Sequence, residues 1–328
     1  MVPAPEASSL SGTEMESFMS SKPDILTIDP LVPLMKERLE KSFTLHPYTS
    51  LENLKNIAPA IRGITTGGGS GVPSEIMDAL PNLEVISVNG VGTDRINLDE
   101  ARRRNIGVAT TQNTLTDDVA DMAVALMMAV MRDIVTNDAF VRAGKWPSAT
   151  APLGRSLTRK KVGIAGFGHI GQAIAKRVSA FGMEVAYFNS HARPESTCHF
   201  EPDLKALATW CDVLILAVSG GPRSANMIDR DILDALGKDG FLVNIARGTV
   251  VDEAALLSAL QEKRIAGAGL DVFQNEPNIN PAFLSLPHTV LQAHQASATV
   301  ETRTAMANLV VDNLIAYFTH KTLLTPVI

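Results

Sequence analysis

The sequence predicts an α/β protein in which two domains each hold a parallel sheet. Short runs rich in β-branched residues alternate with helical stretches through most of the chain, as expected of strands joined by crossover helices. The runs after residue 159 are almost continuously apolar, which is typical of strands covered on both faces. The 328 residues, of which 45% are hydrophobic and 20% charged, are enough for two globular domains.

The first series of strands is expected to follow a tail. Residues 1–22 are rich in Ser, Pro and Glu, and they hold too little apolar surface to offset the entropy of ordering, so they predict a disordered tail. They lack Arg and a long apolar core, and therefore resemble neither a transit nor a secretory peptide. The expected strands are 24–29, 42–48, 61–66, 83–88 and 107–110. Helices are expected between them at 33–41, 73–81 and 97–105.

A long helix is expected next, over 116–143. Thr116 is a suitable N-cap, and Asp117 and Asp118 suit the positive end of the helix dipole. A second series of strands then begins near Arg159. Its members are 160–166, 183–189, 212–218, 240–246, 266–273 and 289–294.

Six strands of this kind complete a doubly wound sheet, so the last helical stretch, 299–321, has no partner strand there. We expect it to pack on the first domain. This gives a discontinuous, smaller, flavodoxin-like substrate domain of 23–111 and 299–328, and a dinucleotide-binding domain of 112–298. Simple sequential domains remain an alternative on the pattern alone.

Composition limits the function classes. A net charge of −6 argues against nucleic acid as a partner. Cys198 and Cys211 form neither a disulfide framework nor a metal-binding pair, so a reducing, cytoplasmic setting and no metal are expected. The most apolar stretch, 119–131, contains Asp121 and is shorter than the roughly 20 residues that a membrane span needs.

The motif GFGHIG predicts a dinucleotide site. Gly166, Gly168 and Gly171 have the spacing GxGxxG, directly after an apolar strand and at the start of a helix, which is the context of the Rossmann fingerprint. These glycines would permit a tight turn, close approach of a pyrophosphate, and packing of the helix on the strand. The expected cofactor contacts of this turn also include Phe167, His169 and Ile170.

The segment after the next strand favours NADP(H), with NAD(H) bound more weakly. A site for NAD carries an acid here to bind the ribose hydroxyls, but this chain has Asn189. Ser190 and His191 can donate hydrogen bonds to a 2′-phosphate, and Arg193 can supply a positive charge. The alternative is that His191 and Arg193 lie in a solvated loop.

Three chemically active residues follow apolar strands of the second series: Arg247, Glu276 and His294. Each alone could be a surface charge, a loop acid or a core histidine. Together, at strand ends beside a dinucleotide fold, they fit the reduction of a 2-keto acid. Arg would bind the carboxylate and polarise the carbonyl, His would donate the proton, and Glu would stabilise the protonated His. A hydrolase is not supported, because GGGSG at 67–71 does not give a GxSxG nucleophile elbow.

At this point the chain resembles the D-isomer-specific 2-hydroxyacid dehydrogenases. The resemblance covers nearly all of 23–328 and includes VNGVGTDRINLD, GFGHIG, NIARGTVVDEAAL, GAGLDVFQNEP and AHQASATVETR. The branch most similar to it contains the NADPH-preferring hydroxypyruvate, glyoxylate and hydroxyphenylpyruvate reductases. The resemblance implies an oxidoreductase that makes a D-2-hydroxy acid from a small 2-keto acid, with Arg247, Glu276 and His294 as its catalytic set.

The resemblance also implies further site residues. Backbone groups around Val91 and Gly92 would bind the substrate carboxylate, with Gly69 of the GGGSG loop close by. Asp271 would bind the nicotinamide amide. The residues implied to line the cofactor or substrate site are Ser219, Ile245 and Ser297. The family is typically a homodimer joined through the nucleotide-binding domains.

Departures from the family pattern leave the substrate side chain open. Ala293 and Ala296 flank the catalytic segment where the family often has Pro and Gly, and Trp146 lies near a region where some members place aromatic residues over a neighbour's site. One alternative is another dehydrogenase chemistry, such as formate or phosphoglycerate oxidation. A second is a dinucleotide-sensing, corepressor-like binding protein on the same fold.

Overall fold

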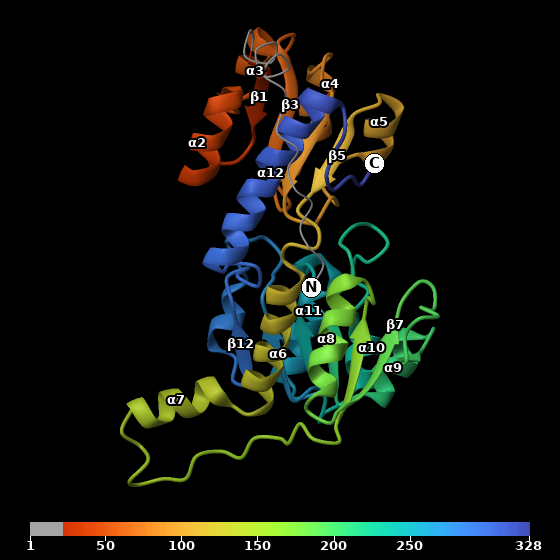
Figure 1. Ribbon diagram of the computed structural model, residues 1–328. Coiled ribbons are helices and arrows are strands. Elements are labelled where there is room, and N and C mark those ends of the chain that lie inside the picture. Colours follow the sequence, from red (N-terminus) through yellow and green to blue (C-terminus); the bar gives the residue numbers. More distant parts are fainter. Residues whose placement is uncertain (1–21) are drawn as a thin grey trace. The chain divides into compact units, whose positions relative to one another are not determined.

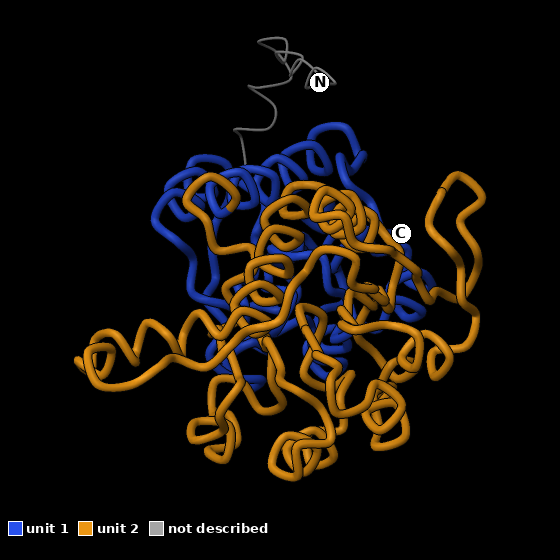
Figure 2. The backbone as a smooth tube through the Cα atoms, turned by 90° about the horizontal axis from the view of Figure 1, so that it is seen from below, with its two compact units in different colours: residues 1–112, 303–328 blue, residues 113–302 orange. Residues whose placement is uncertain are grey.

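The structure, a computed structural model, describes residues 22–328. The tail expected over 1–22 therefore lies outside the described residues, apart from Lys22. The described residues form two compact units, one of 22–112 with Arg303–Ile328 and one of Asn113–Thr302 (Figure 2). In the part of the chain that the structure describes, no helix is long and apolar enough to cross a membrane.

Unit 1 contains a five-stranded, all-parallel sheet in the order β2-β1-β3-β4-β5, which is the flavodoxin-like order (Figure 1). Its strands are β1 (Asp24–Thr27), β2 (Thr44–Pro47), β3 (Ile61–Gly67), β4 (Val85–Asn89) and β5 (Gly107–Thr110). Its helices are α2 (Pro33–Ser42), α3 (Leu51–Ile57), α4 (Ser74–Ala79) and α5 (Leu98–Arg103). Helix α3 was not among the expected helices; Ser50 caps it by accepting a hydrogen bond from the Asn53 N–H.

The last helix, α12 (Val300–His320), packs on one face of this sheet. Val310, Val311 and Leu314 from α12 are buried against Ile25 and Val85 from the strands. The apolar spacing of the helix is thus used in the core of unit 1.

Unit 2 contains a seven-stranded, all-parallel sheet in the order β12-β11-β10-β9-β6-β7-β8. The strands are β6 (Lys161–Ala165), β7 (Glu184–Phe188), β8 (His199–Phe200), β9 (Val213–Leu216), β10 (Phe241–Asn244), β11 (Gly267–Leu270) and β12 (Thr289–Leu291). Six of them follow the doubly wound Rossmann order, with β12 added beyond β11. The predicted fold class is confirmed. The expectation of six strands missed β8, whose two residues are too few to give a pattern.

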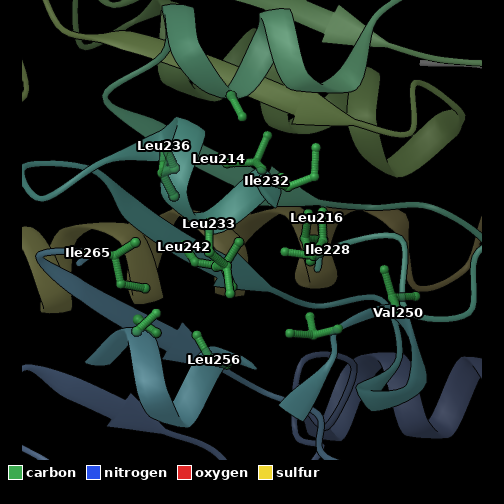
Figure 3. Packing of buried hydrophobic residues seen from close by; sticks show 14 of the residues in the cluster. Leu214, Leu216, Ile228, Ile232, Leu233, Leu236, Leu242, Val250, Leu256 and Ile265 are labelled. Carbon is green, nitrogen blue, oxygen red and sulfur yellow. The ribbon is translucent and has the colours of Figure 1, made fainter. Parts of the chain in front are cut away.

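Unit 2 contains six helices within the described residues, and all of them except α7 pack against its sheet or its core. They are α6 (Thr116–Met131), α7 (Ile134–Arg142), α8 (His169–Ser179), α9 (Leu204–Trp210), α10 (Arg230–Leu236) and α11 (Glu253–Gln261), with short 3-10 turns η1 (Gly248–Val250) and η2 (Pro281–Ser285). Figure 3 shows the core where Leu214 and Leu242 of the strands meet Leu233 of α10 and Leu256 of α11.

The single helix expected over 116–143 is wrong. The helix α6 ends at Met131. Asp133 then adopts a left-handed conformation with φ of 50°, which cannot be part of a continuous α-helix, and α7 begins at Ile134. Thr116 is also not the N-cap: Leu115 takes that position, without a side-chain cap, and Thr116 is the first helical residue. Asp117 and Asp118 do lie in the first turn of α6, as expected.

Candidate active site

The Gly-rich turn connects β6 to α8, and its three glycines differ in what surrounds them. A Cβ at Gly166, where φ is 95°, would lie 2.5 Å from the Val218 backbone nitrogen. A Cβ at Gly171 would lie 2.1 Å from the Gly166 carbonyl oxygen. A Cβ at Gly168 would meet no protein atom within 4 Å. Two glycines therefore allow strand and helix to pack, whereas the third leaves open space before the N-terminus of α8. That arrangement fits a pyrophosphate.

The remaining residues of the turn are not equivalent. The Phe167 side chain is only 1% exposed, so the expectation that it contacts the cofactor is limited to its backbone. The His169 side chain is exposed and Ile170 is half-buried, both at the first positions of α8.

The loop after β7 carries the four residues expected at the 2′-phosphate. The Asn189 amide donates to the His191 carbonyl oxygen at 3.1 Å, so this side chain shapes the loop. The Ser190 hydroxyl lies 3.2 Å from His191 Nδ1, and both side chains are exposed. Arg193 is also exposed, and within residues 22–328 it forms no ion pair. Its guanidinium is therefore open to an anionic ligand.

Arg247, Glu276 and His294 come together at one edge of the sheet in unit 2. They follow β10, β11 and β12, which are neighbours in the sheet, at the carboxyl ends where open α/β sheets bind their ligands. His294 Nδ1 lies 2.7 Å from Glu276 Oε2. The other carboxylate oxygen, Oε1, accepts the Phe273 N–H at 2.8 Å. The Arg247 guanidinium donates to the Ala246 carbonyl oxygen at 2.7 Å.

The charge state of Glu276 determines which nitrogen of His294 carries a proton. Burial alone would raise the pKa of the Glu276 carboxyl, but hydrogen bonds from His294 and the Phe273 N–H, with the charge of Arg247, outweigh it and hold the pKa below its ordinary value. At neutral pH the carboxylate can only accept hydrogen bonds, so Nδ1 of the imidazole must donate. The Nε2 atom is then the nitrogen left for proton transfer.

The turn that carries His294 is held by Asp271. His294 has a left-handed φ of 54°, and its N–H donates to the Asp271 carbonyl oxygen at 2.8 Å. The Asp271 carboxylate accepts the N–H groups of Gln295 at 2.7 Å and Ala296 at 3.0 Å. This carboxylate is only 1% exposed. In this structure Asp271 fixes the backbone beside His294, and binding of a nicotinamide amide stays a prediction.

Unit 1 contains two adjacent glycine loops, in which the residues expected to bind the substrate carboxylate lie. A Cβ at Gly68 would lie 3.4 Å from the Gly92 carbonyl oxygen, so the loops after β3 and β4 approach closely. Gly69 and Val91 are exposed and Gly92 is half-buried. The first loop is held by Asp29, whose carboxylate accepts the Gly67 N–H at 2.6 Å and the Ser70 hydroxyl. Sequence reasoning missed Asp29, although it lies two residues after the end of β1, at the same edge of the sheet.

Comparisons with known proteins decide the family. Residues 124–296 match the model of the D-isomer specific 2-hydroxyacid dehydrogenase, NAD binding domain. The chain is 98% identical over 310 residues to 2-ketogluconate reductase of Gluconobacter oxydans, covering 94% of this chain and 100% of that protein.

The chain belongs to the D-isomer-specific 2-hydroxyacid dehydrogenase family.

Two further family members are similar over nearly their whole length. Hydroxyphenylpyruvate reductase of Plectranthus scutellarioides is 39% identical, over 93% of this chain and 98% of that protein. The crystal structure of the NADPH-dependent glyoxylate/hydroxypyruvate reductase from Sinorhizobium meliloti, in complex with NADP and malonate, matches with a TM-score of 0.89 and 40% identity, over 94% of this chain and 97% of that one. The chain is an oxidoreductase of this family, a reductase of 2-keto acids.

The other family-implied residues lie near the same strand ends of unit 2. Ser219 follows β9, and its carbonyl oxygen accepts the Ser224 hydroxyl at 2.7 Å. Ile245 directly follows β10 and is buried, and Ser297 is half-buried three residues after His294. Their roles as lining residues stay predictions. Sequence reasoning also missed Tyr187, which is buried under the Gly-rich turn, because nothing in the local pattern of β7 distinguishes it from a core aromatic.

Proposed function

We propose that this chain reduces 2-ketogluconate to gluconate with NADPH as the hydride donor. The observation that carries the substrate is the 98% identity, over 94% of the chain, to a protein named 2-ketogluconate reductase. Hydroxypyruvate and glyoxylate, the substrates expected from the sequence, are proposed as secondary substrates, since the relatives named for them are near 40% identical.

Three side chains of unit 2 are assigned to the chemistry. The rigid fork of donors on Arg247 polarises the keto oxygen, and His294 delivers its Nε2 proton to that oxygen. Glu276 holds the imidazole in place through the 2.7 Å contact with Nδ1, which leaves Nε2 for this transfer. When bound, NADPH supplies the hydride to the keto carbon. Backbone groups at Val91 and Gly92, with Gly69, are proposed to bind the substrate carboxylate.

The cofactor preference is proposed from two parts of unit 2. The open space at Gly168 and the N-terminus of α8 suit the pyrophosphate, which is common to NADP and NAD. The absence of an acid at Asn189 and the exposed guanidinium of Arg193 suit the 2′-phosphate, which only NADP carries. Ser190 and His191 would add hydrogen bonds.

We also propose that the protein is a homodimer, joined through unit 2. Helix α7 buries none of its residues within the chain, and with the segment that follows it extends away from the rest of unit 2 (Figures 1 and 2). The exposed apolar side chains of this region are Ile134, Val135, Val141, Trp146 and Leu153. A second copy would cover them. A cytoplasmic location is proposed from the two free cysteines.

The test is a matrix of kcat/KM values. Purified protein is assayed by NADPH and NADH oxidation with 2-ketogluconate, hydroxypyruvate, glyoxylate and phenylpyruvate. The proposal predicts the highest value for the pair of 2-ketogluconate and NADPH. A higher value with hydroxypyruvate or glyoxylate would overturn the substrate, and a preference for NADH would overturn the cofactor. No turnover with any keto acid would favour a dinucleotide-sensing binding protein.

A further inference from the structure

A buried aromatic pair connects the Gly-rich turn to the loop after β7. The rings of Phe167, from the turn, and Tyr187, from β7, stack with centroids 3.8 Å apart and planes 16° apart. Each residue is 1% exposed. Tyr187 is also fixed by its strand, since it pairs with Ile164 of β6 and Phe200 of β8. The position of the Tyr187 ring relative to the Gly-rich turn is therefore fixed.

The hydroxyl of Tyr187 reaches the loop that follows its own strand. The Arg193 N–H donates to the Tyr187 hydroxyl oxygen at 2.7 Å. Two other bonds close the loop: the Asn189 amide donates to His191, and the Ser196 N–H donates to the Arg193 carbonyl oxygen at 3.0 Å. The backbone of Arg193 is thus held on both sides, whereas its side chain is exposed.

A phenylalanine could fill the same stack without this bond. Burying a hydroxyl is unfavourable unless it is hydrogen-bonded, so the hydroxyl of Tyr187 is accommodated because it has the Arg193 N–H as its partner. Because the Tyr187 ring stacks on Phe167 of the Gly-rich turn, this bond also fixes the backbone of Arg193 relative to that turn.

We propose that Tyr187 is a positioning residue for cofactor choice: it sets the distance between the Arg193 charge and the Gly-rich turn, and so selects a dinucleotide with a phosphate on the adenosine 2′-oxygen. This inference rests on the proposed preference for NADPH. Tyr187 itself would touch neither cofactor nor substrate, and would act through the backbone of Arg193.

The test measures binding directly, by calorimetric titration with 2′-phospho-ADP-ribose and with ADP-ribose. Tyr187→Phe keeps the stacked ring and removes the hydroxyl. We expect a roughly three- to tenfold weaker Kd for 2′-phospho-ADP-ribose, the size of effect that losing one hydrogen bond gives, and no change for ADP-ribose. The KM for NADPH should rise in parallel while kcat at saturating NADPH stays the same.

Two controls separate positioning from general damage. Tyr317→Phe makes the same chemical change in unit 1, where that hydroxyl interacts with Glu84, and should leave both Kd values unchanged. In an Arg193→Ala background, Tyr187→Phe should produce no further change in the ratio of the two Kd values, since it acts through Arg193. Thermal unfolding of each variant shows whether the fold is kept.

The outcomes distinguish this inference from the proposed function. A wild-type protein that binds ADP-ribose as well as 2′-phospho-ADP-ribose overturns the NADPH proposal and this inference with it. A wild type that prefers the 2′-phosphate, with Tyr187→Phe weakening both ligands equally or neither, overturns the role of Tyr187 alone. A full effect of Tyr187→Phe in the Arg193→Ala background does the same.

Discussion

Substituting Gly168 by alanine should separate cofactor binding from folding. Gly168 has φ of −77° and ψ of −160°, a conformation open to any residue, and the added Cβ would meet no protein atom within 4 Å. The fold should therefore tolerate the change, and the reduced freedom of the unfolded chain should stabilise it by about 0.4–1 kcal/mol. The methyl group would instead occupy the space assigned to the pyrophosphate. We expect NADPH binding to weaken by at least about tenfold, which corresponds to about 1.4 kcal/mol.

Gly171→Ala is the matched control from the same motif. Its Cβ would lie 2.1 Å from the Gly166 carbonyl oxygen, so helix and turn must separate, and such overpacking costs about 1–3 kcal/mol or more in stability. The assay is a pair of measurements on each variant: Kd for NADPH by fluorescence titration, and the free energy of unfolding in urea. A Gly168→Ala protein that binds NADPH with the wild-type Kd would refute the placement of the pyrophosphate. A Gly168→Ala protein as unstable as Gly171→Ala would refute the conclusion that the fold leaves room for a side chain at Gly168.

Three further predictions follow from contacts elsewhere. Asp29→Asn removes one of the acceptors that hold the GGGSG loop, so KM for the keto acid should rise about fivefold, equivalent to ~1 kcal/mol, with KM for NADPH unchanged; equal rises in both would contradict a local role. Hydrogen bonds from Thr299 and Thr302 lower the pKa of Asp118 in the folded protein. The ionised carboxylate therefore adds to the free energy of unfolding above the unfolded-state pKa of about 4, and this stabilisation is lost as the pH falls through the lower pKa of the folded state. Asp118→Asn should cost ~1 kcal/mol in urea unfolding at pH 7, and a cost that does not shrink at pH 3.5 would contradict this assignment. Burial raises the pKa of the Cys211 thiol to about 12, so a thiol reagent at pH 8 should modify at most Cys198 in the native protein and both cysteines in denaturant; rapid native modification of two thiols would count against the fold around Cys211.

The sheet of unit 2 was predictable because most of its strands are covered on both faces and form continuous apolar runs. The breaks in regular structure were not. The sequence from Thr116 to Arg142 keeps helical character throughout, and only the left-handed conformation of Asp133 divides it into α6 and α7. The strand β8 escaped prediction for a different reason, because pairing with β7 and not its own two-residue pattern makes it a strand.

The candidate site shows a similar division. Arg247, Glu276 and His294 could be proposed from the sequence, because each follows an apolar strand and parallel strands end at a common edge. Asp29 and Tyr187 could not, because their partners are backbone groups of other segments. Such contacts depend on the conformation of the loops, which cannot be predicted from the spacing of residues along the chain.

The most direct test of the proposed chemistry is the single-turnover rate of the His294→Ala variant with bound NADPH and saturating 2-ketogluconate. Loss of the proton donor should lower this rate by about 10²–10⁴-fold while the Kd for NADPH stays near the wild-type value. A variant within threefold of the wild-type rate would contradict the assignment of His294 as the general acid, and with it the role given to the contact between His294 and Glu276.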